Sequence, residues 1–580
     1  MKILRALALA ALSGCAATGG TVTPGIRYEA ILTRDRYGVP HIAGRSPADA
    51  AYALGQAQSE DRPADIVQNL SAGSGRLAEL FGPAWVENDR RARELNHRGR
   101  VEADWPRLPL AVQQMVQAFV AGVNDWIAEH PRAFPGPVRA FEAVDVVAWH
   151  RHLLMAPEIA VARLDAEGGP GPRVEPGRGN AWAVAGARSA TGKPVLLIDP
   201  HGPFDGPLAP YEAHLRAGEL DVWGHFPVGS PLPLSGATPW AAWALTSGGA
   251  DAADAFALRL NPVDPDEYEW EGKFVRMETR REAIRVREPG PPKDVELRFR
   301  ATRHGPVLLD SKGRAFAAWL GSGDHARALE QFWRMSTARS GAEFKAALAL
   351  DRISFRDVVW ASTDGAVGFV QTGQVPERAG GQDWEQPVPG WTALTRPAGK
   401  LPFHKLPRVD DPPAGFLQSC DVSADRVTPG LPWKREDFPA GALYAHLGEY
   451  RARASRATDL LQDTPRMDLD AARRIAFDTY SPPADLWIPV ILAAAREAGL
   501  PAELAEAVDL LRGWSRHADA GSAGATLFRF WRLACSDVPG GRAGRDTFSV
   551  SDTPEIRREA LDALRRAVET LRRLHGRVAV

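Results

Sequence analysis

The stretches Gly179-Asn-Ala-Trp-Ala-Val184 and Pro194-Val-Leu-Leu-Ile-Asp-Pro-His201 decide the fold of this chain. Both contain short apolar runs that predict buried strands, Trp182–Val184 and Pro194–Ile198, and the turn Thr191-Gly-Lys193 joins them. The segment just before them, residues 165–179, is rich in Gly and Pro and is expected to form an exposed loop. Strand-like segments separated by turns continue from there to about residue 320.

Helical patterns lie on both sides of this β-rich block. Apolar residues recur at helical spacing over residues 110–127, and helices are expected again near 325–351 and beyond 455. The last helix begins after a Thr553 cap and ends at Gly576. Its apolar positions are Ile556, Leu561, Leu564, Val568, Leu571 and Leu574. The order of helices, strands and helices predicts a layered α+β protein and not a doubly wound sheet.

The composition is that of an ordinary globular protein. The chain has 580 residues, of which 24% are charged and 44% hydrophobic, enough for a large core in one to three domains. The formal net charge of -2 gives no electrostatic attraction towards nucleic acid or anionic lipid, so neither is an expected partner. Beyond the N-terminus, no run approaches the ~20 apolar residues of a membrane helix.

The N-terminus has the pattern of a bacterial export signal. Lys2 and Arg5 precede the apolar run Ala6–Leu12, and Leu-Ser-Gly-Cys15 follows, which resembles a lipobox. In this interpretation residues 1–15 are a lipoprotein signal peptide, Cys15 is lipidated, and the small polar residues 16–27 are a tether. The alternative is an ordinary cleavage after small residues, with Cys15 incidental.

A lipid-anchored, exported protein would face the periplasm and touch the membrane only through its anchor. Ala16 follows the cysteine, and no aspartate is there to retain the protein at the inner membrane, so an outer-membrane lipoprotein is expected. Cys420 and Cys535 leave open whether a disulfide forms in that oxidising compartment, because two cysteines alone do not report whether they meet in space.

Several motifs along the chain occur in the order found in one enzyme family. They are Arg34-Asp-Arg-Tyr-Gly-Val-Pro-His-Ile42, Gly55-Gln-Ala-Gln-Ser-Glu-Asp-Arg62, Asn180-Ala-Trp-Ala-Val184, Asp199-Pro-His201, Thr246-Ser-Gly-Gly-Ala-Asp251, His304-Gly-Pro-Val307, Gly415-Phe-Leu-Gln-Ser-Cys-Asp421 and Arg453-Ala-Ser-Arg456. Together they resemble the penicillin acylases, which include the aculeacin and acyl-homoserine-lactone acylases. The resemblance covers roughly residues 28 to 575, although each motif alone is weak.

The resemblance implies the N-terminal-nucleophile hydrolase fold, an αββα sandwich with helical N-terminal and C-terminal segments. It divides the chain into an α-subunit-like helical region (28–164), a spacer-like Gly/Pro linker (165–178) and a β-subunit-like region (179–580). Members of this family usually continue beyond the last helix with further strands of the sandwich. The chain is therefore expected to be C-terminally truncated relative to the family.

In this family the precursor cuts itself in the linker and frees a serine at the start of the β chain. The α-amine of that serine is the general base for its hydroxyl. The serine is expected immediately before Asn180, where this chain has Gly179. No Ser, Thr or Cys occurs from Gly75 to Arg188, so a shifted alignment does not supply one. The chain is therefore expected to stay uncut across Arg178–Gly179.

The resemblance implies four further site residues. His201 matches a histidine that orients the nucleophile, Ser247 matches the backbone oxyanion donor, and Arg453 matches a site arginine. Asp421 stands at the position of the oxyanion asparagine, and an ionised carboxylate accepts hydrogen bonds without donating them. The alternative for His201 is a histidine of the core or of a turn. The alternative for Arg453 is a surface ion pair.

A structural calcium ion is also implied by the resemblance. Glu158, Asp251, the Ala253 carbonyl and Asp254 match family ligands, and such oxygen donors suit Ca2+. The alternative is a pair of acidic residues on a solvated turn.

By resemblance, then, the chain is a hydrolase of linear amides, with a small acyl amide as its substrate, whose activity is impaired at Gly179 and Asp421. The alternative is an active penicillin or acyl-homoserine-lactone acylase with an unrecognised nucleophile. A conventional hydrolase or metalloenzyme is disfavoured, because the chain has no Gly-x-Ser-x-Gly elbow, His-Glu-x-x-His motif or phosphate loop.

Overall fold

The structure is a computed structural model. It describes residues 2–5, 28–134, 136, 138–167, 178–248, 250–309, 314–321, 324–353, 355–439, 441–443, 452–536 and 552–580. Cys15, the tether and most of the signal peptide and linker lie outside these residues. The interpretations that depend on them stay predictions.

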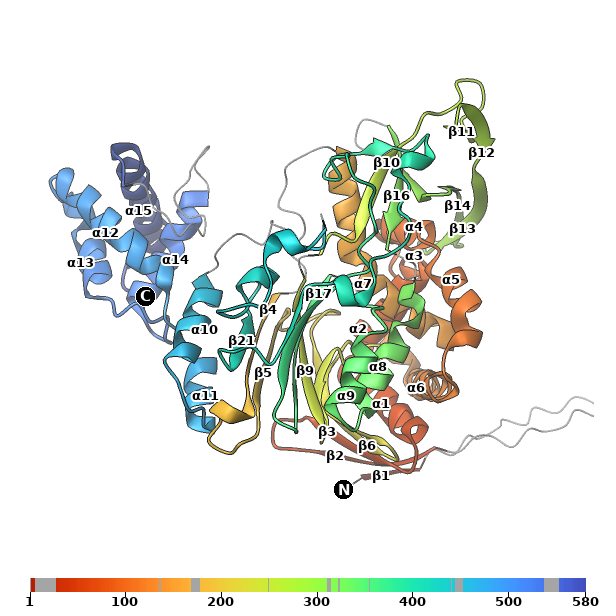
Figure 1. Ribbon diagram of the computed structural model, residues 1–580, viewed down its shortest axis with the longest axis horizontal. Coiled ribbons are helices and arrows are strands. Elements are labelled where there is room, and N and C mark those ends of the chain that lie inside the picture. The colour runs from red at the N-terminus through yellow and green to blue at the C-terminus, as the bar shows by residue number, and fades with distance from the viewer. Residues whose placement is uncertain are drawn as a thin grey trace, which may run out of the picture.

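A ten-stranded sheet forms the centre of the molecule (Figure 1). Its strands, in spatial order, are β1 (Lys2–Arg5), β2 (Glu29–Arg34), β3 (Pro40–Gly44), β6 (Tyr211–Ala217), β7 (Leu220–Phe226), β8 (Ser235–Ala237), β9 (Ala241–Ser247), β17 (Arg356–Ser362), β18 (Val367–Thr372) and β20 (Arg408–Asp410). All neighbours pair antiparallel except β3 and β6. Strands β2 and β3 lie in the region 28–164, which was expected to be a helical, α-subunit-like region.

A second, three-stranded sheet packs on β9, β17 and β18. Its order is β21 (Phe416–Ser419), β4 (Arg178–Val184) and β5 (Val195–His201). On β4, Ala181 and Ala183 face the large sheet, and Trp182 and Val184 face the other way, because side chains alternate along a strand. All four are at most 2% exposed, which confirms the predicted buried strand.

Helices cover both outer faces of the two sheets. The helices α1 (Pro47–Asp61), α6 (Leu110–Glu129), α8 (Ala328–Thr337) and α9 (Gly341–Leu348) lie on the side of the large sheet, and α10 (Ala452–Gln462) and α11 (Leu469–Ala476) cover the small one (Figure 1). The result is the predicted αββα sandwich. Within the described residues, the second sheet has three strands.

The remaining elements surround the sandwich. A six-stranded sheet has the order β13 (Glu278–Val286), β14 (Lys293–Thr302), β15 (Gly305–Leu309), β16 (Ala315–Leu320), β10 (Ala253–Ala257) and β19 (Val388–Pro389), and β11 (Glu267–Trp270) and β12 (Lys273–Arg276) form a separate ribbon. Helix α7 (Ala143–Glu167) packs on β10 and β16. Helices α2 (Pro63–Ser74), α3 (Leu77–Phe81), α4 (Val86–Glu94) and α5 (His97–Asp104) complete the N-terminal region.

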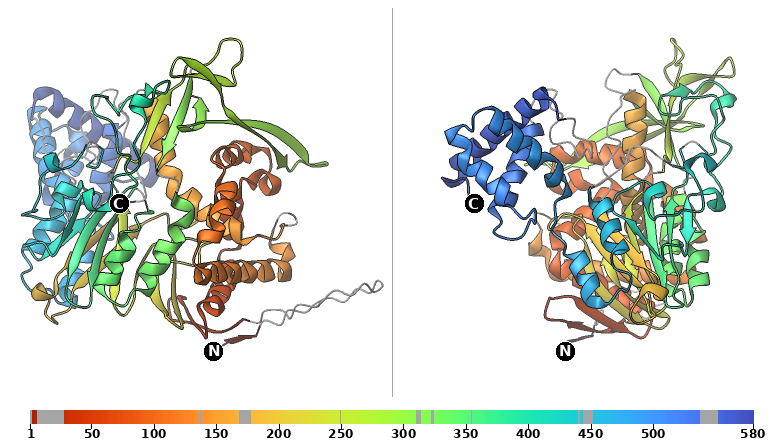
Figure 2. Two further views of the ribbon diagram at one scale, coloured as in Figure 1. Left: turned by 45° about the vertical axis from the view of Figure 1, so that its right-hand side comes forward. Right: turned by 60° about the vertical axis from the view of Figure 1, so that its left-hand side comes forward.

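The C-terminal helices form a bundle that stands beside α10 and has its own core (Figure 2). They are α12 (Pro482–Glu497), α13 (Ala505–Gly513), α14 (Ala523–Ser536) and α15 (Pro554–His575). The predicted ends of α15 are confirmed, since Thr553 accepts a hydrogen bond from the Ile556 amide and Gly576 is left-handed. Leu574, in the last turn of α15, is 59% exposed.

Two further expectations concern the cysteines and the membrane. Cys420 and Cys535 are both buried free thiols in different core clusters, so they do not form a disulfide. None of the helices in the described part of the chain has the length and apolar composition that a membrane crossing requires.

The contact between α1 and α6 depends on one glycine in each helix. A Cβ on Gly122 would lie 2.2 Å from the carbonyl oxygen of Tyr52, and a Cβ on Gly55 would lie 2.3 Å from that of Phe119. Gly122→Ala is therefore expected to lower the free energy of unfolding by about 1–3 kcal/mol, because the helices must move apart. Chemical denaturation measures this. Gly513→Ala is the control, because its Cβ would meet no atom within 4 Å; equal stabilities of the two variants would contradict the prediction.

Candidate active site

The predicted nucleophile position, Gly179, lies where the two sheets of the sandwich meet. It is buried on β4, opposite Pro200 of β5. A Cβ here would have as its nearest neighbours the Asp199 carbonyl oxygen at 3.2 Å, Thr246 Cγ2 at 3.6 Å and the Leu245 carbonyl oxygen at 3.7 Å. Gly179 contributes no side chain to this position, so a nucleophile here would have to come from another residue.

Arg453, in the first turn of α10, links most of the predicted site residues. Its Nη1 donates to Asn180 Oδ1 at 2.7 Å and lies 3.3 Å from His201 Nδ1 and 3.4 Å from the Gly179 carbonyl oxygen. Its Nη2 donates to the Asp421 carboxylate. Residues that are more than 200 positions apart in sequence, such as Gly179 and Arg453, thus meet at one end of the small sheet.

Asp199 also belongs to this cluster, although no site role was predicted for it. Its Oδ2 lies 2.9 Å from His201 Nε2 and accepts a hydrogen bond from Asn180 Nδ2 at 2.9 Å. The hydrogen bond from His201, aided by Asn180 and the charge of Arg453, holds the pKa of Asp199 below its usual value despite partial burial. Asp199 precedes His201 by two positions on a strand, so the period-2 rule alone places both on one face.

His201 has a defined set of partners. Nε2 faces the Asp199 carboxylate and Nδ1 faces the Arg453 guanidinium, which can only donate. This arrangement suits a ring whose Nε2 donates to Asp199 and whose Nδ1 accepts from Arg453. His201 is therefore held between an acceptor and a donor beside Gly179, as an orienting residue would be.

Asp421 and Ser247 complete the set of expected site residues. Asp421 is 1% exposed, has φ of 57°, and forms an ion pair with Arg453. Ser247 is the last residue of β9, is buried, and follows Thr246, which lies beside Gly179. The carboxylate at 421 presents acceptors towards Arg453, whereas an oxyanion requires donors.

A buried hydroxyl chain runs behind the site. Thr246 and Ser419 share a hydrogen bond of 2.7 Å between their hydroxyl groups, and Ser419 Oγ donates to Asp357 Oδ2 at 3.3 Å. Complete burial, together with the nearby charge of Asp421, raises the pKa of Asp357 well above its usual value. Burial thus disfavours the charged form of Asp357, and Ser419 stands between its carboxyl group and Thr246.

This elevated pKa predicts a pH dependence of stability. A carboxyl group whose pKa is higher in the folded than in the unfolded protein destabilises the fold once the pH exceeds its unfolded value of about 3.9. The free energy of unfolding should fall by up to about 1.4 kcal/mol per pH unit from there to the folded pKa. Asp357→Asn should remove this fall, as measured by denaturation at pH 5 and pH 8. The exposed Asp470→Asn is the control; parallel profiles for wild type and Asp357→Asn would contradict the prediction.

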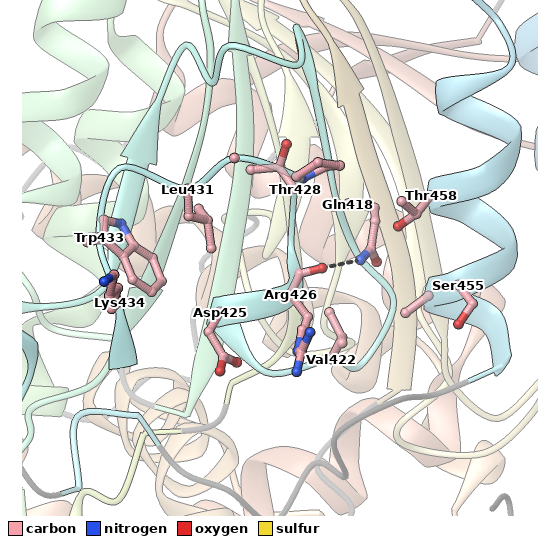
Figure 3. A pocket seen from close by; sticks show the side chains of 13 residues that line it. Gln418, Val422, Asp425, Arg426, Thr428, Leu431, Trp433, Lys434, Ser455 and Thr458 are labelled. Atoms are coloured by element: carbon pink, nitrogen blue, oxygen red, sulfur yellow. Dashed lines mark hydrogen bonds between the residues drawn. The ribbon is translucent and has the colours of Figure 1, made fainter. Parts of the chain in front are cut away.

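A hollow of about 450 Å³ opens next to Asp421 and Arg453 (Figure 3). Its lining includes Val422 and Ala454, their immediate neighbours in sequence. Apolar and charged groups share the wall, namely Leu431, Trp433, Asp425, Arg426 and Lys434. The hydrogen bond from Gln418 Nε2 to the Arg426 carbonyl, 3.0 Å, holds one side of it. The hollow is of a size suited to a small ligand.

The residues expected to bind calcium lie elsewhere, around the start of β10. Asp251 and Asp254 both form ion pairs with Arg378, and Ala253 between them is fully buried. Glu158, on α7, pairs instead with His325 at 2.8 Å. In the described part of the chain, no group of three or more His, Cys, Asp or Glu side chains is placed to hold a metal ion.

Comparison with known proteins gives one family. The model of the family described as penicillin amidase matches residues 29–578. Penicillin acylase 2 proenzyme of Pseudomonas sp. (strain SE83) is 27% identical over 91% of this chain and 74% of the relative. Acyl-homoserine lactone acylase PvdQ of Pseudomonas putida is 25% identical over 86% of this chain and 72% of the relative.

A solved structure is also similar. Thermostable penicillin G acylase from Alcaligenes faecalis, in its orthorhombic form, superimposes with a TM-score of 0.49 and 20% identity, covering 68% of this chain and 79% of the other. The family match, which extends over nearly the whole chain, carries the conclusion. The protein belongs to the penicillin amidase family of acyl-amide hydrolases.

Proposed function

We propose that this chain is a member of the penicillin amidase family that has lost most or all of its hydrolysis of linear amides. One observation carries the proposal: Gly179 stands where the family's nucleophile is expected, surrounded by His201, Asn180 and Arg453. Without a side-chain hydroxyl, neither the N-to-O acyl shift of self-cleavage nor an acyl-enzyme can form at this position.

The charge at Asp421 supports the same proposal. The developing oxyanion of a tetrahedral intermediate needs hydrogen-bond donors, and losing one typically lowers the rate by about 100- to 1,000-fold. A carboxylate adds repulsion to that loss, although its ion pair with Arg453 offsets part of the charge. Two elements of the family mechanism are therefore altered in the same site.

An active acylase with another nucleophile is the alternative, and among the described residues Thr246 is a hydroxyl residue beside Gly179. Its Cγ2 is the side-chain atom nearest to a Cβ at position 179, but its hydroxyl bonds to Ser419. It lies inside β9 and so has no free α-amine, and burial raises the pKa of Asp357, at the end of the hydroxyl chain, well above its usual value. Nothing in this arrangement activates Thr246.

Intact mass and turnover of the purified protein test the proposal. We expect one chain that is not cut between Arg178 and Gly179, and no release of amine from penicillin G or from an N-acyl-homoserine lactone. Two fragments divided near residue 179, or turnover that Thr246→Val abolishes, would refute it. Thr246→Val is suitable because valine keeps the shape of threonine and removes only the hydroxyl.

The proposal extends to the location of the protein. The signal-like residues 1–15 and Cys15 support an exported lipoprotein anchored in the outer membrane and facing the periplasm. Its mature chain would lack β1, which lies at the edge of the ten-stranded sheet and pairs with β2. Expression in a bacterium that processes lipoproteins should give a mature chain that begins at Cys15, carries a lipid mass increment and sediments with membranes. Cys15→Ala should abolish both properties; an unchanged mass and location would contradict the anchor.

A further inference from the structure

Arg378 occupies a buried position between two carboxylates near the start of β10. Its Nε lies 3.0 and 3.2 Å from the two carboxylate oxygens of Asp254. Its Nη2 lies 2.9 Å from Asp254 Oδ1, 3.0 Å from Asp251 Oδ2 and 3.0 Å from the Asp251 carbonyl oxygen. The three side chains are only 4%, 3% and 1% exposed. One guanidinium group thus holds two buried carboxylates and a backbone carbonyl.

The backbone beside Arg378 leaves room for the guanidinium group because residue 441 is a glycine. Gly441 has φ of 86°, and a Cβ on it would lie 1.8 Å from Arg378 Nη1. The same residue is fixed to the site, because the Asp251 amide donates to the Gly441 carbonyl at 2.8 Å. Any other residue at 441 would displace the guanidinium, so the position of Arg378 depends on this glycine.

The third carboxylate that was expected to bind calcium has a separate partner. Glu158 pairs with His325, and both side chains are fully buried. The carboxylates expected to bind calcium are therefore divided between two partners, Arg378 and His325, and are not gathered around one point. As arranged, these residues do not fit a divalent cation, because the space between Asp251 and Asp254 is filled by the Arg378 side chain.

We propose that Arg378 is a built-in replacement for the calcium ion of this site. Two buried carboxylates so close together need a positive charge, since each would otherwise carry a desolvation penalty of several kcal/mol. A planar guanidinium supplies that charge with directed, bidentate hydrogen bonds, which an ammonium group cannot. The fold of this chain is therefore independent of calcium. This inference does not depend on whether the protein hydrolyses amides.

The wild-type protein provides the first test. Its melting temperature should be the same, within about 1 °C, in 5 mM EDTA and in 5 mM CaCl2, because a metal stabilises only a protein that binds it. Equilibrium dialysis with radioactive calcium should detect no bound ion at micromolar concentrations. A melting temperature that falls in EDTA and recovers with calcium would overturn the proposal.

Arg378→Ala provides the second test. In EDTA its melting temperature should be lower than that of the wild type by about 3–4 °C, because two carboxylates lose their countercharge. Calcium at about 100 times its dissociation constant should restore about 2 °C, since the cation then fills the vacated place. Arg435→Ala, which breaks a more exposed arginine pair with Asp425, is the control and should show no response to calcium.

A third variant keeps the test decisive if Arg378→Ala does not fold. The triple variant Arg378→Ala/Asp251→Asn/Asp254→Asn has no buried charge at this place, so it should fold with a higher melting temperature than the single variant. It should not respond to calcium. If the triple variant is no more stable than the single one, or if the folded single variant gains nothing from calcium, Arg378 is not acting as the cation of this site.

Discussion

The double variant Gly179→Ser/Asp421→Asn is expected to cut itself into two chains, residues up to 178 and residues from 179, where the wild type stays whole. Serine restores the hydroxyl that attacks the preceding peptide bond, and its freed α-amine then becomes a general base. Asparagine restores an oxyanion donor. Gel electrophoresis and mass spectrometry report the cut, and turnover of an acyl amide reports the active site.

The structure is compatible with this repair. A Cβ at position 179 would lie 3.2 Å from the Asp199 carbonyl oxygen, so the strands need to separate by only a few tenths of an ångström. Asparagine at 421 keeps an oxygen that can accept from Arg453, so the link between the two residues survives.

Two single variants serve as controls. Gly179→Ala adds the Cβ without the hydroxyl and should remain uncut. Gly179→Ser alone should cut more slowly than the double variant, by about 100- to 1,000-fold, because Asp421 still presents a carboxylate. If the double variant folds but remains uncut, the loss of activity does not reside in these two positions.

The second large effect is expected at Arg453. Arg453→Met should lower the free energy of unfolding by about 2–3 kcal/mol, because the carboxylate of Asp421, 1% exposed, would be left without a countercharge. The side chain of Arg453 is 35% exposed, so the loss should be smaller than for a fully buried pair. Urea denaturation of the purified variant measures it.

A double-mutant cycle shows whether the loss comes from this ion pair. In the Asp421→Asn background, Arg453→Met should cost at least 1 kcal/mol less than in the wild type, by the usual size of coupling between contacting groups (about 0.5–3 kcal/mol). Arg456→Met, one turn along α10, breaks the more exposed pair with Asp478 and should cost about 1 kcal/mol or less. Additive effects in the cycle would refute the coupling of Arg453 and Asp421.

Much of the fold could be predicted from local patterns. The apolar run of β4, the apolar spacing of α6 and the caps of α15 are properties of neighbouring residues, and all three were predicted correctly. Strands β2 and β3 were missed, because they are short and their pairing with each other and with β6 involves distant residues. The family motifs identified the residues that gather around Gly179, although their catalytic roles stay predictions.

The sequence by itself determined the layered α+β class, the family and the missing hydroxyl at Gly179, because each follows from which residues stand next to one another in the chain; the sandwich was expected only through the resemblance to that family. Only the tertiary structure decided which buried charges meet, such as Arg378 with Asp251 and Asp254, more than 120 positions away. It also separated the two cysteines and isolated Asp357 from solvent. The physical reason is that burial fixes the cost of a charge and the identity of its partner, and burial depends on how distant segments pack.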